Sequence, residues 1–202
     1  MRNMKNDKQL DLLLSRLKSD DREVSDDALF ALADMGPAAL DALPALVLDL
    51  NDSDPSVRVI AALAIGYIGG PNATAVAALI KATEDEDSDV RGEAAYGLAM
   101  IDCEDALPLL IKLLRNDVTD VRQRVAEALG FPVYRHEDAI KPLTEALHDE
   151  DWVVRMFAAQ SLGHIGIVIP SVFMPLIEAL EDENEEVVET ADQALGRIFG
   201  EN

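Results

Sequence analysis

An internal repeat runs through almost the whole chain and limits its possible folds more than any other feature. Six valines mark it at nearly equal intervals: Val24, Val57, Val90, Val121, Val154 and Val187. Counted from each valine, position +4 is Ala or Val, position +7 is a small residue, and position +8 is Leu or Ile. Because positions 0, +4, +7, +8 and +11 share one face of a helix, each copy predicts an amphipathic helix, here called the valine helix.

A further helix precedes each valine helix, with its clearest examples at 9–18, 40–50, 105–114, 139–147 and 173–180. We expect a proline early in four of these helices, where a missing N–H costs little: Pro44, Pro108, Pro142 and Pro175. An acidic turn joins the two helices of a pair. The sequence therefore predicts one domain, residues 1–202, with six helix pairs at approximately 8–35, 37–69, 71–102, 104–133, 137–167 and 170–200.

The copies resemble the HEAT-like repeat of the phycobilisome-lyase type. That unit is roughly D-x-x-V-R-x-x-A-A-x-A-L-G-x-I-G, and it is matched here at 52–69, 87–101, 119–130 and 151–166. The resemblance covers nearly the whole chain. It implies an all-α fold, a right-handed alpha-alpha superhelix or solenoid, with the valine helices on the inner, concave surface and the proline-containing helices on the outer one.

An arginine follows the valine in the four inner copies: Arg58, Arg91, Arg122 and Arg155. The pairs Asp54–Arg58, Asp87–Arg91 and Asp151–Arg155 are spaced i, i+4 with the acid first, which is the favourable order for an ion pair on a helix. The acid also stands at the positive end of the helix. We therefore interpret these six residues as structural; in repeat arrays such groups can also bridge neighbouring copies.

Positions +2, +3, +6 and +10 of each valine helix are left uncovered by the stacking and predict a binding groove. Its middle is apolar and aromatic, and contiguous apolar surface on a soluble protein is normally used for binding. The predicted partner-binding groove comprises Val59, Ile60, Leu63, Tyr67, Glu93, Tyr96, Met100, Arg124, Glu127, Phe131, Met156, Phe157, Gln160 and His164. The alternative is that tight curvature buries these side chains against one another.

Trp152 stands two positions before its valine, at the predicted rim of the groove. The other copies have residues there that suit an exposed helix start: Arg22, Pro55, Ser88, Thr119 and Glu185. An exposed tryptophan at this position can anchor a partner. It can equally cover Phe131 or Tyr134 locally, and the sequence favours neither interpretation.

The sequence offers no constellation that is typical of catalysis. Its three histidines, His136, His148 and His164, lie in separate places, and no two have metal-ligand spacing on one helix. HEAT-like deoxyhypusine hydroxylases carry His-Glu pairs at +2 and +3, and no copy has such a pair here. The single cysteine, Cys103, has no histidine beside it. We therefore predict no catalytic residue, no metal and no cofactor.

The net charge of −22 is concentrated in the turns inside the helix pairs. Residues 19–24, 49–56, 84–89, 116–120, 149–151 and 181–186 hold 21 acids and one base. Carboxylates at these places cap helices and keep the array soluble. Because phosphate neutralisation needs surplus Lys and Arg, the charge argues against nucleic-acid binding, and it disfavours an anionic membrane surface.

Together these features predict a non-catalytic protein–protein interaction module or scaffold, whose partner is another protein rather than nucleic acid or membrane. We expect a cytoplasmic location, since the first residues lack the apolar stretch of a signal peptide. We also expect a monomer or a weak dimer. Two alternatives stay open. The resemblance implies a phycobilin lyase-like or phycobilisome-associated factor that binds a bilin or a phycobiliprotein, and the acidic edge is compatible with an inhibitor that mimics nucleic acid.

Overall fold

The computed structural model describes residues 4–101, 103–131 and 137–200. Its α-helices are α1 (Met4–Leu17), α2 (Arg22–Asp34), α3 (Leu43–Asp49), α4 (Pro55–Gly69), α5 (Ala73–Ala82), α6 (Ser88–Met100), α7 (Leu107–Asn116), α8 (Thr119–Ala128), α9 (Glu137–Ala146), α10 (Trp152–Ile165), α11 (Pro170–Ala179) and α12 (Glu185–Phe199). Short 3-10 helices, η1 (Gly36–Ala42) and η2 (Glu104–Ala106), precede α3 and α7. No strand occurs within the described residues, and the predicted all-α fold is confirmed.

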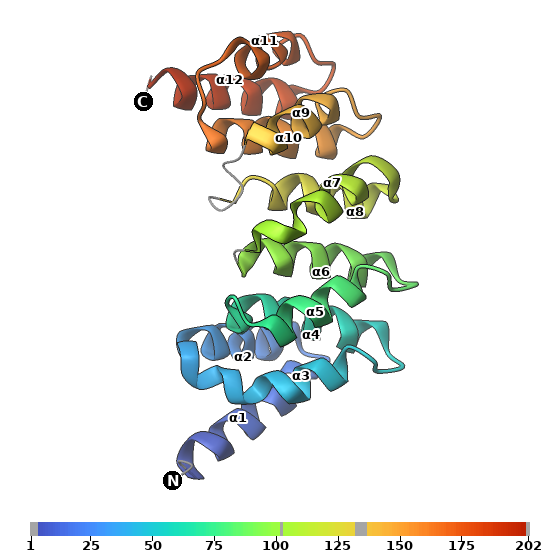
Figure 1. The fold of residues 1–202 in the computed structure, drawn as a ribbon, viewed down its shortest axis with the longest axis vertical. Coiled ribbons are helices and arrows are strands. Elements are labelled where there is room, and N and C mark those ends of the chain that lie inside the picture. Colours follow the sequence, from blue (N-terminus) through green and yellow to red (C-terminus); the bar gives the residue numbers. More distant parts are fainter. Residues whose placement is uncertain (1–3, 102, 132–136, 201–202) are drawn as a thin grey trace. The chain divides into compact units, whose positions relative to one another are not determined.

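The chain forms two compact units, Met1–Asp102 and Cys103–Asn202, each with three of the predicted helix pairs. In the first unit the valine helices α2, α4 and α6 pack in succession and are paired with α1, α3 and α5. In the second, α8, α10 and α12 pack in succession and are paired with α7, α9 and α11. Figure 1 shows this order of pairs within each unit. The valine helices are called inner helices below, and their partners outer helices.

The repeat register accounts for the core of each unit. The residue at +4 has at most 1% of its surface exposed in all six copies: Ala28, Ala61, Ala94, Val125, Ala158 and Ala191. The residue at +8 is fully buried in five copies, and only Leu195 of the last copy keeps exposed surface. Burial of these side chains is the dominant stabilising contribution, at about 25 cal/mol per Å² of apolar surface.

Successive inner helices approach closely because small residues face each other at the crossing. A Cβ atom on Gly66 would lie 2.7 Å from the Gly97 Cα atom, and one on Gly163 would lie 2.8 Å from the Ala194 Cα atom. In both cases position +9 of one copy meets position +7 of the next copy. The small residue at +7 that the sequence shows in every copy is therefore a packing requirement of the helix crossing.

Four of the acidic turns inside the pairs, those before α4, α6, α10 and α12, share a two-part structure. The second acid or amide of an Asp-x-Asp or Asp-x-Asn sequence caps the inner helix: Asp54 accepts from the Ser56 N–H at 2.9 Å, and Asp151 accepts from the Val153 N–H at 3.0 Å. The first acid accepts the backbone N–H of the second, as Asp149 does from Asp151 at 2.9 Å. Such caps stabilise a helix by about 1 kcal/mol each.

The structure corrects the expected pairing of the repeat arginines. The Asp54 and Asp151 carboxylates cap their helices, while Arg58 and Arg155 reach across to the first acid of the next repeat. Three inter-repeat ion pairs form in this way, each spanning 27 residues with two hydrogen bonds of 2.7 to 3.0 Å: Arg58–Asp85, Arg122–Asp149 and Arg155–Asp182. The expectation that such groups bridge neighbouring copies fits this geometry, whereas the i, i+4 partner was wrong for Arg58 and Arg155.

Two of the four prolines lie deeper in their helices than expected. Pro44 and Pro108 occupy the first turns of α3 and α7 as predicted, whereas Pro142 and Pro175 lie inside α9 and α11. In those two helices the residues before the proline already have helical geometry. A proline removes one N–H, but it does not prevent a helix from beginning one turn earlier.

Ser161 provides a test of the contact between α8 and α10. Its buried hydroxyl donates a 2.7 Å hydrogen bond to the Ala126 carbonyl in the preceding copy. We expect Ser161→Ala to lower the free energy of unfolding by about 1 kcal/mol, the usual net contribution of one such bond. Urea unfolding followed by circular dichroism measures the change. An unchanged midpoint would show that the hydrogen bond contributes nothing beyond packing.

Candidate functional site

In the first unit, the predicted groove residues lie on adjacent inner helices and are all half-buried. Helix α4 carries four of them and α6 three: Val59, Ile60, Leu63, Tyr67, Glu93, Tyr96 and Met100. Because α4 and α6 pack against each other, the structure brings these side chains onto one surface, here called the first inner face. The exposed ring of Phe30 on α2 meets Tyr67 edge-on, with centroids 6.3 Å apart, and extends this face.

In the second unit, the corresponding residues lie on α8 and α10 and in the turn after α8: Arg124, Glu127, Phe131, Met156, Phe157, Gln160 and His164. His164 is exposed and the other six are half-buried. Arg124 and Glu127 form an ion pair of 2.6 Å, which cancels the charge of this part of the surface. These seven residues are called the second inner face.

None of the fourteen predicted groove residues is buried, whereas the +4 residues of the same helices are. The alternating exposure follows from helix geometry, because positions +2, +3, +6 and +10 point away from the outer helix of the pair. Apolar and aromatic side chains therefore keep part of their surface open to solvent in each unit. That the two faces bind a partner remains a prediction.

Trp152 is the first residue of α10, and 40% of its surface is exposed. It lines a pocket together with Glu150, Asp151, Arg155, Glu183 and Asn184. The pocket lies along the acidic edge of the second unit, where the turns before α10 and α12 meet. Of the two possible neighbours predicted for Trp152, Tyr134 lies outside the described residues.

Hydrogen bonds at this edge lower the pKa of two carboxylates, Asp182 and Asp151. The Arg155 guanidinium, bonded to both oxygens of Asp182, lowers the pKa of Asp182 below its ordinary value, and the same bonds raise the pKa of Arg155. Partial burial alone would raise the pKa of Asp151. The Gln123 side chain, which donates at 2.9 Å, and the capped N–H groups outweigh burial, so the pKa of Asp151 is also lowered.

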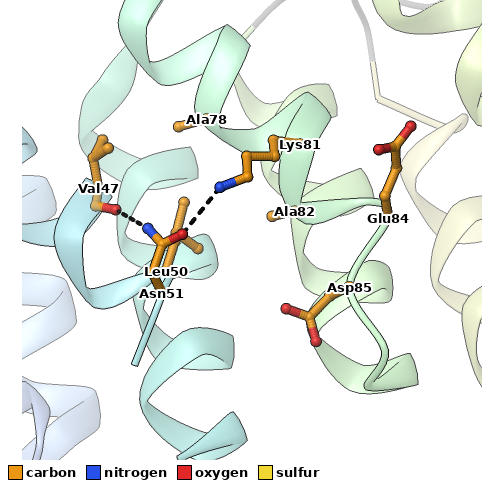
Figure 2. Close-up of a pocket in the computed structure, with 8 residues that line it drawn as sticks. All are labelled: Val47, Leu50, Asn51, Ala78, Lys81, Ala82, Glu84 and Asp85. Atoms are coloured by element: carbon orange, nitrogen blue, oxygen red, sulfur yellow. Dashed lines mark hydrogen bonds between the residues drawn. The ribbon is translucent and has the colours of Figure 1, made fainter. Parts of the chain in front are cut away.

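A second pocket lies between the outer helices of the first unit (Figure 2). Its volume is about 290 Å³, and its lining comes from the ends of α3 and α5 and the turn after α5. The Lys81 ammonium donates to the Asn51 side-chain oxygen at 3.0 Å, and the Asn51 amide donates to the Val47 carbonyl at 3.1 Å. These groups already join successive outer helices, so we assign this pocket a structural role.

The described residues contain no cluster of three or more metal-ligating side chains. His148 lies exposed in the turn after α9 and His164 lies on the second inner face, so these two do not form a common site; His136 lies outside the described residues. Cys103 is half-buried at the start of η2. Among the described helices, none is both long and apolar enough to cross a membrane.

Sequence reasoning missed the glutamates that flank Trp152. Glu150 and Glu183 lie one repeat apart, at the same place in successive acidic turns, and their side chains are 84% and 91% exposed. The repeat spacing was the signal that could have paired them across the pocket. It was hidden because all six turns are rich in acid, so single glutamates did not stand out.

A family model described as HEAT repeats matches residues 43–130 and 119–196. An engineered protein of solved structure is 26% identical, with a TM-score of 0.60 over 95% of this chain and 96% of that one. The complex of CpcE and CpcF of phycocyanin lyase from a Nostoc species is 23% identical, with a TM-score of 0.63 over 77% of this chain and 99% of that one. A designed armadillo repeat protein, solved with a (KR)4 peptide, is 22% identical, with a TM-score of 0.59 over 94% and 99%. No curated protein is significantly similar in sequence.

Proposed function

Because this chain belongs to the HEAT repeat family, we propose that it is a non-catalytic interaction module that binds a partner protein through its inner faces. The observation that carries this proposal is the exposure pattern of the inner helices. Their +4 residues are buried in every copy, while large apolar and aromatic side chains at +2, +3, +6 and +10 stay half-exposed. Aromatic residues and methionine at a surface of this kind are the residue types enriched at interface centres.

Two further features support a protein partner. The second inner face is nearly neutral, since Arg124 and Glu127 are paired, so it does not suit a polyanion. More than half of the protein's acids lie instead in the turns, where several carboxylates cap helices or pair with repeat arginines. The designed armadillo repeat protein, which has a similar fold, was solved in complex with a (KR)4 peptide, and this supports a protein partner.

Replacing Tyr67, Tyr96 and Phe157 together with serine tests the proposal. We expect the triple variant to capture at least about tenfold less partner from a lysate of the source cells, because large aromatic anchors dominate interface energetics. The matched control replaces exposed apolar residues of the outer helices, Leu48, Ile80 and Met174, with serine. The control should capture as much partner as the unmodified protein, and equal capture by the triple variant would contradict the proposal.

A second candidate function is a role in handling a bilin or a phycobiliprotein. It is favoured by one observation, the structural likeness to the CpcE–CpcF complex. At 23% identity this likeness establishes a similar fold only. In this case the aromatic side chains of the inner faces would hold a tetrapyrrole. Incubation with a free linear tetrapyrrole, followed by absorption spectroscopy, distinguishes the two functions. A spectral shift that occurs with the unmodified protein but not with the triple serine variant would favour the bilin role. An unchanged spectrum would contradict the bilin role and leave protein binding as the remaining proposal.

A further inference from the structure

The pocket beside Trp152 has the size and lining of a site for one side chain. Its volume is about 290 Å³, which is at the lower limit of pockets that hold small molecules. Its lining combines one large aromatic ring with charged groups: Glu150, Asp151, Trp152, Arg155, Glu183 and Asn184. All six belong to the turns and helix starts of two successive repeats in the second unit.

The electrostatic balance of this pocket favours a cation. Three carboxylates line it, and the one cationic group in the lining, Arg155, already has its charge matched by Asp182, which contacts it at 2.7 Å. The Arg155 Nη1 group donates to the Asp149 and Glu150 carbonyls, so its donors are also used. An entering cation therefore meets surplus negative charge.

The two glutamates are placed to receive such a cation. Glu150 accepts a hydrogen bond of 3.2 Å from Arg122 and Glu183 lies 3.7 Å from Arg155, yet both side chains remain more than four-fifths exposed. Each contact is peripheral, because Asp149 and Asp182 make the bidentate pairs with those arginines. The glutamate carboxylates can therefore accept hydrogen bonds from an incoming group without breaking the bidentate pairs Arg122–Asp149 and Arg155–Asp182.

Trp152 distinguishes this turn from the others. The first unit has the same arrangement at Arg58 and Asp85, with Glu86 at 3.9 Å, but Pro55 stands where Trp152 stands here. A tryptophan ring attracts a cation through its quadrupole, and arginine is the side chain that most often stacks on it. Only the second unit therefore joins an exposed tryptophan to flanking carboxylates.

We propose that the Trp152 pocket binds an arginine side chain in a basic segment of a partner protein. The guanidinium stacks on the indole ring and donates to the Glu150 and Glu183 carboxylates. Arginine fits better than lysine, because its planar fork can serve two carboxylates while its face stays on the ring. The site lies on the acidic edge, outside both inner faces, and it does not depend on the function proposed for them.

The test uses the intrinsic fluorescence of Trp152, which is the single tryptophan of the chain. Hexa-arginine is titrated into the full-length protein, and hexa-lysine serves as the peptide of equal charge. We expect hexa-arginine to change the emission saturably and hexa-lysine to bind more weakly by about threefold or more. Equal binding of the two peptides would overturn the choice of arginine, and hexa-arginine binding without any change in emission would overturn the site.

Two double variants separate the pocket from general attraction to acid. Glu150→Gln with Glu183→Gln should raise the Kd for hexa-arginine by about tenfold or more, because it removes both carboxylate acceptors. The matched control, Glu84→Gln with Glu86→Gln, removes the same charge from the acidic turn at 84–89, which has no tryptophan beside it. It should change the Kd by less than about twofold. Equal effects would mean that only diffuse charge acts, which contradicts the proposal.

The indole ring itself is tested by calorimetry, since its removal also removes the fluorescence. Trp152→Ala should raise the Kd for hexa-arginine by about tenfold, whereas Trp152→Phe, which keeps an aromatic face, should raise it by about threefold or less. The triple serine variant of the inner faces should bind hexa-arginine normally. If Trp152→Ala binds as tightly as the unmodified protein, the proposal fails, whatever the outcome for the inner faces.

Discussion

Gly163→Ala is expected to lower the free energy of unfolding by about 2 kcal/mol, although alanine is the better helix former. The added methyl group would lie 2.7 Å from the Ala194 Cβ atom and 2.8 Å from its Cα atom. Backbone cannot move aside as a flexible side chain can, so α10 and α12 must separate along their crossing. The loss of contact outweighs the gain in helix propensity, which is about 1 kcal/mol.

Gly196→Ala is the matched control. Gly196 stands at the same +9 position of the last inner helix, where it is half-exposed and no described helix follows. There the substitution should stabilise by up to about 1 kcal/mol. Urea unfolding followed by circular dichroism measures both variants, and the change in midpoint at constant slope gives the effect. If Gly163→Ala also stabilised the protein, the close crossing would not be a constraint.

Arg155→Ala is expected to destabilise the protein by about 2 kcal/mol at neutral pH, which is less than the roughly 3–5 kcal/mol for a fully buried ion pair, because both side chains keep some contact with solvent. The substitution removes two hydrogen bonds to Asp182, of 2.7 and 2.8 Å, and those to the Asp149 and Glu150 carbonyls. It leaves the Asp182 carboxylate, which is 12% exposed, without its guanidinium. Arg155→Lys keeps the positive charge but loses the planar guanidinium that bonds both carboxylate oxygens, so its destabilisation should be smaller than that of Arg155→Ala.

The same variant should have a different acid sensitivity. Since hydrogen bonds from Arg155 lower the pKa of Asp182 in the folded protein, the unfolded chain binds a proton first as the pH falls. Unmodified protein therefore loses this stabilisation as the pH drops below the ordinary carboxyl pKa of about 3.9 and through the folded-state value. Arg155→Ala has already lost it. Its deficit should shrink between pH 5 and about pH 2, as unfolding midpoints at several pH values would show.

Much of the fold could be predicted from the sequence, because the repeated spacing determines which residues share one face of each helix. The buried +4 residues and the small +7 residues follow directly from a period of 3.6, which six copies repeat. Helix starts were harder to predict. Pro142 and Pro175 show why, since a proline marks where a helix can begin without fixing where it does.

Side-chain partners were less predictable than the fold. The i, i+4 spacing of Asp151 and Arg155 is a valid pairing rule for an isolated helix, but here the carboxylate is engaged by the N–H groups of Val153 and Val154. The long arginine side chain is then better satisfied by Asp182 of the next turn. Local spacing cannot choose between these partners, because the second one exists only after the copies have stacked.

The same 27-residue separation recurs in Arg58–Asp85, Arg122–Asp149 and Arg155–Asp182. A bond whose two ends are always one copy apart does not depend on which copies are neighbours. Duplicating a copy that carries both partners, such as residues 149–181, would give the repeated arginine an aspartate at the same separation and leave neither charge unpaired. An array built in this way can gain a copy while the chemistry that joins its copies stays the same.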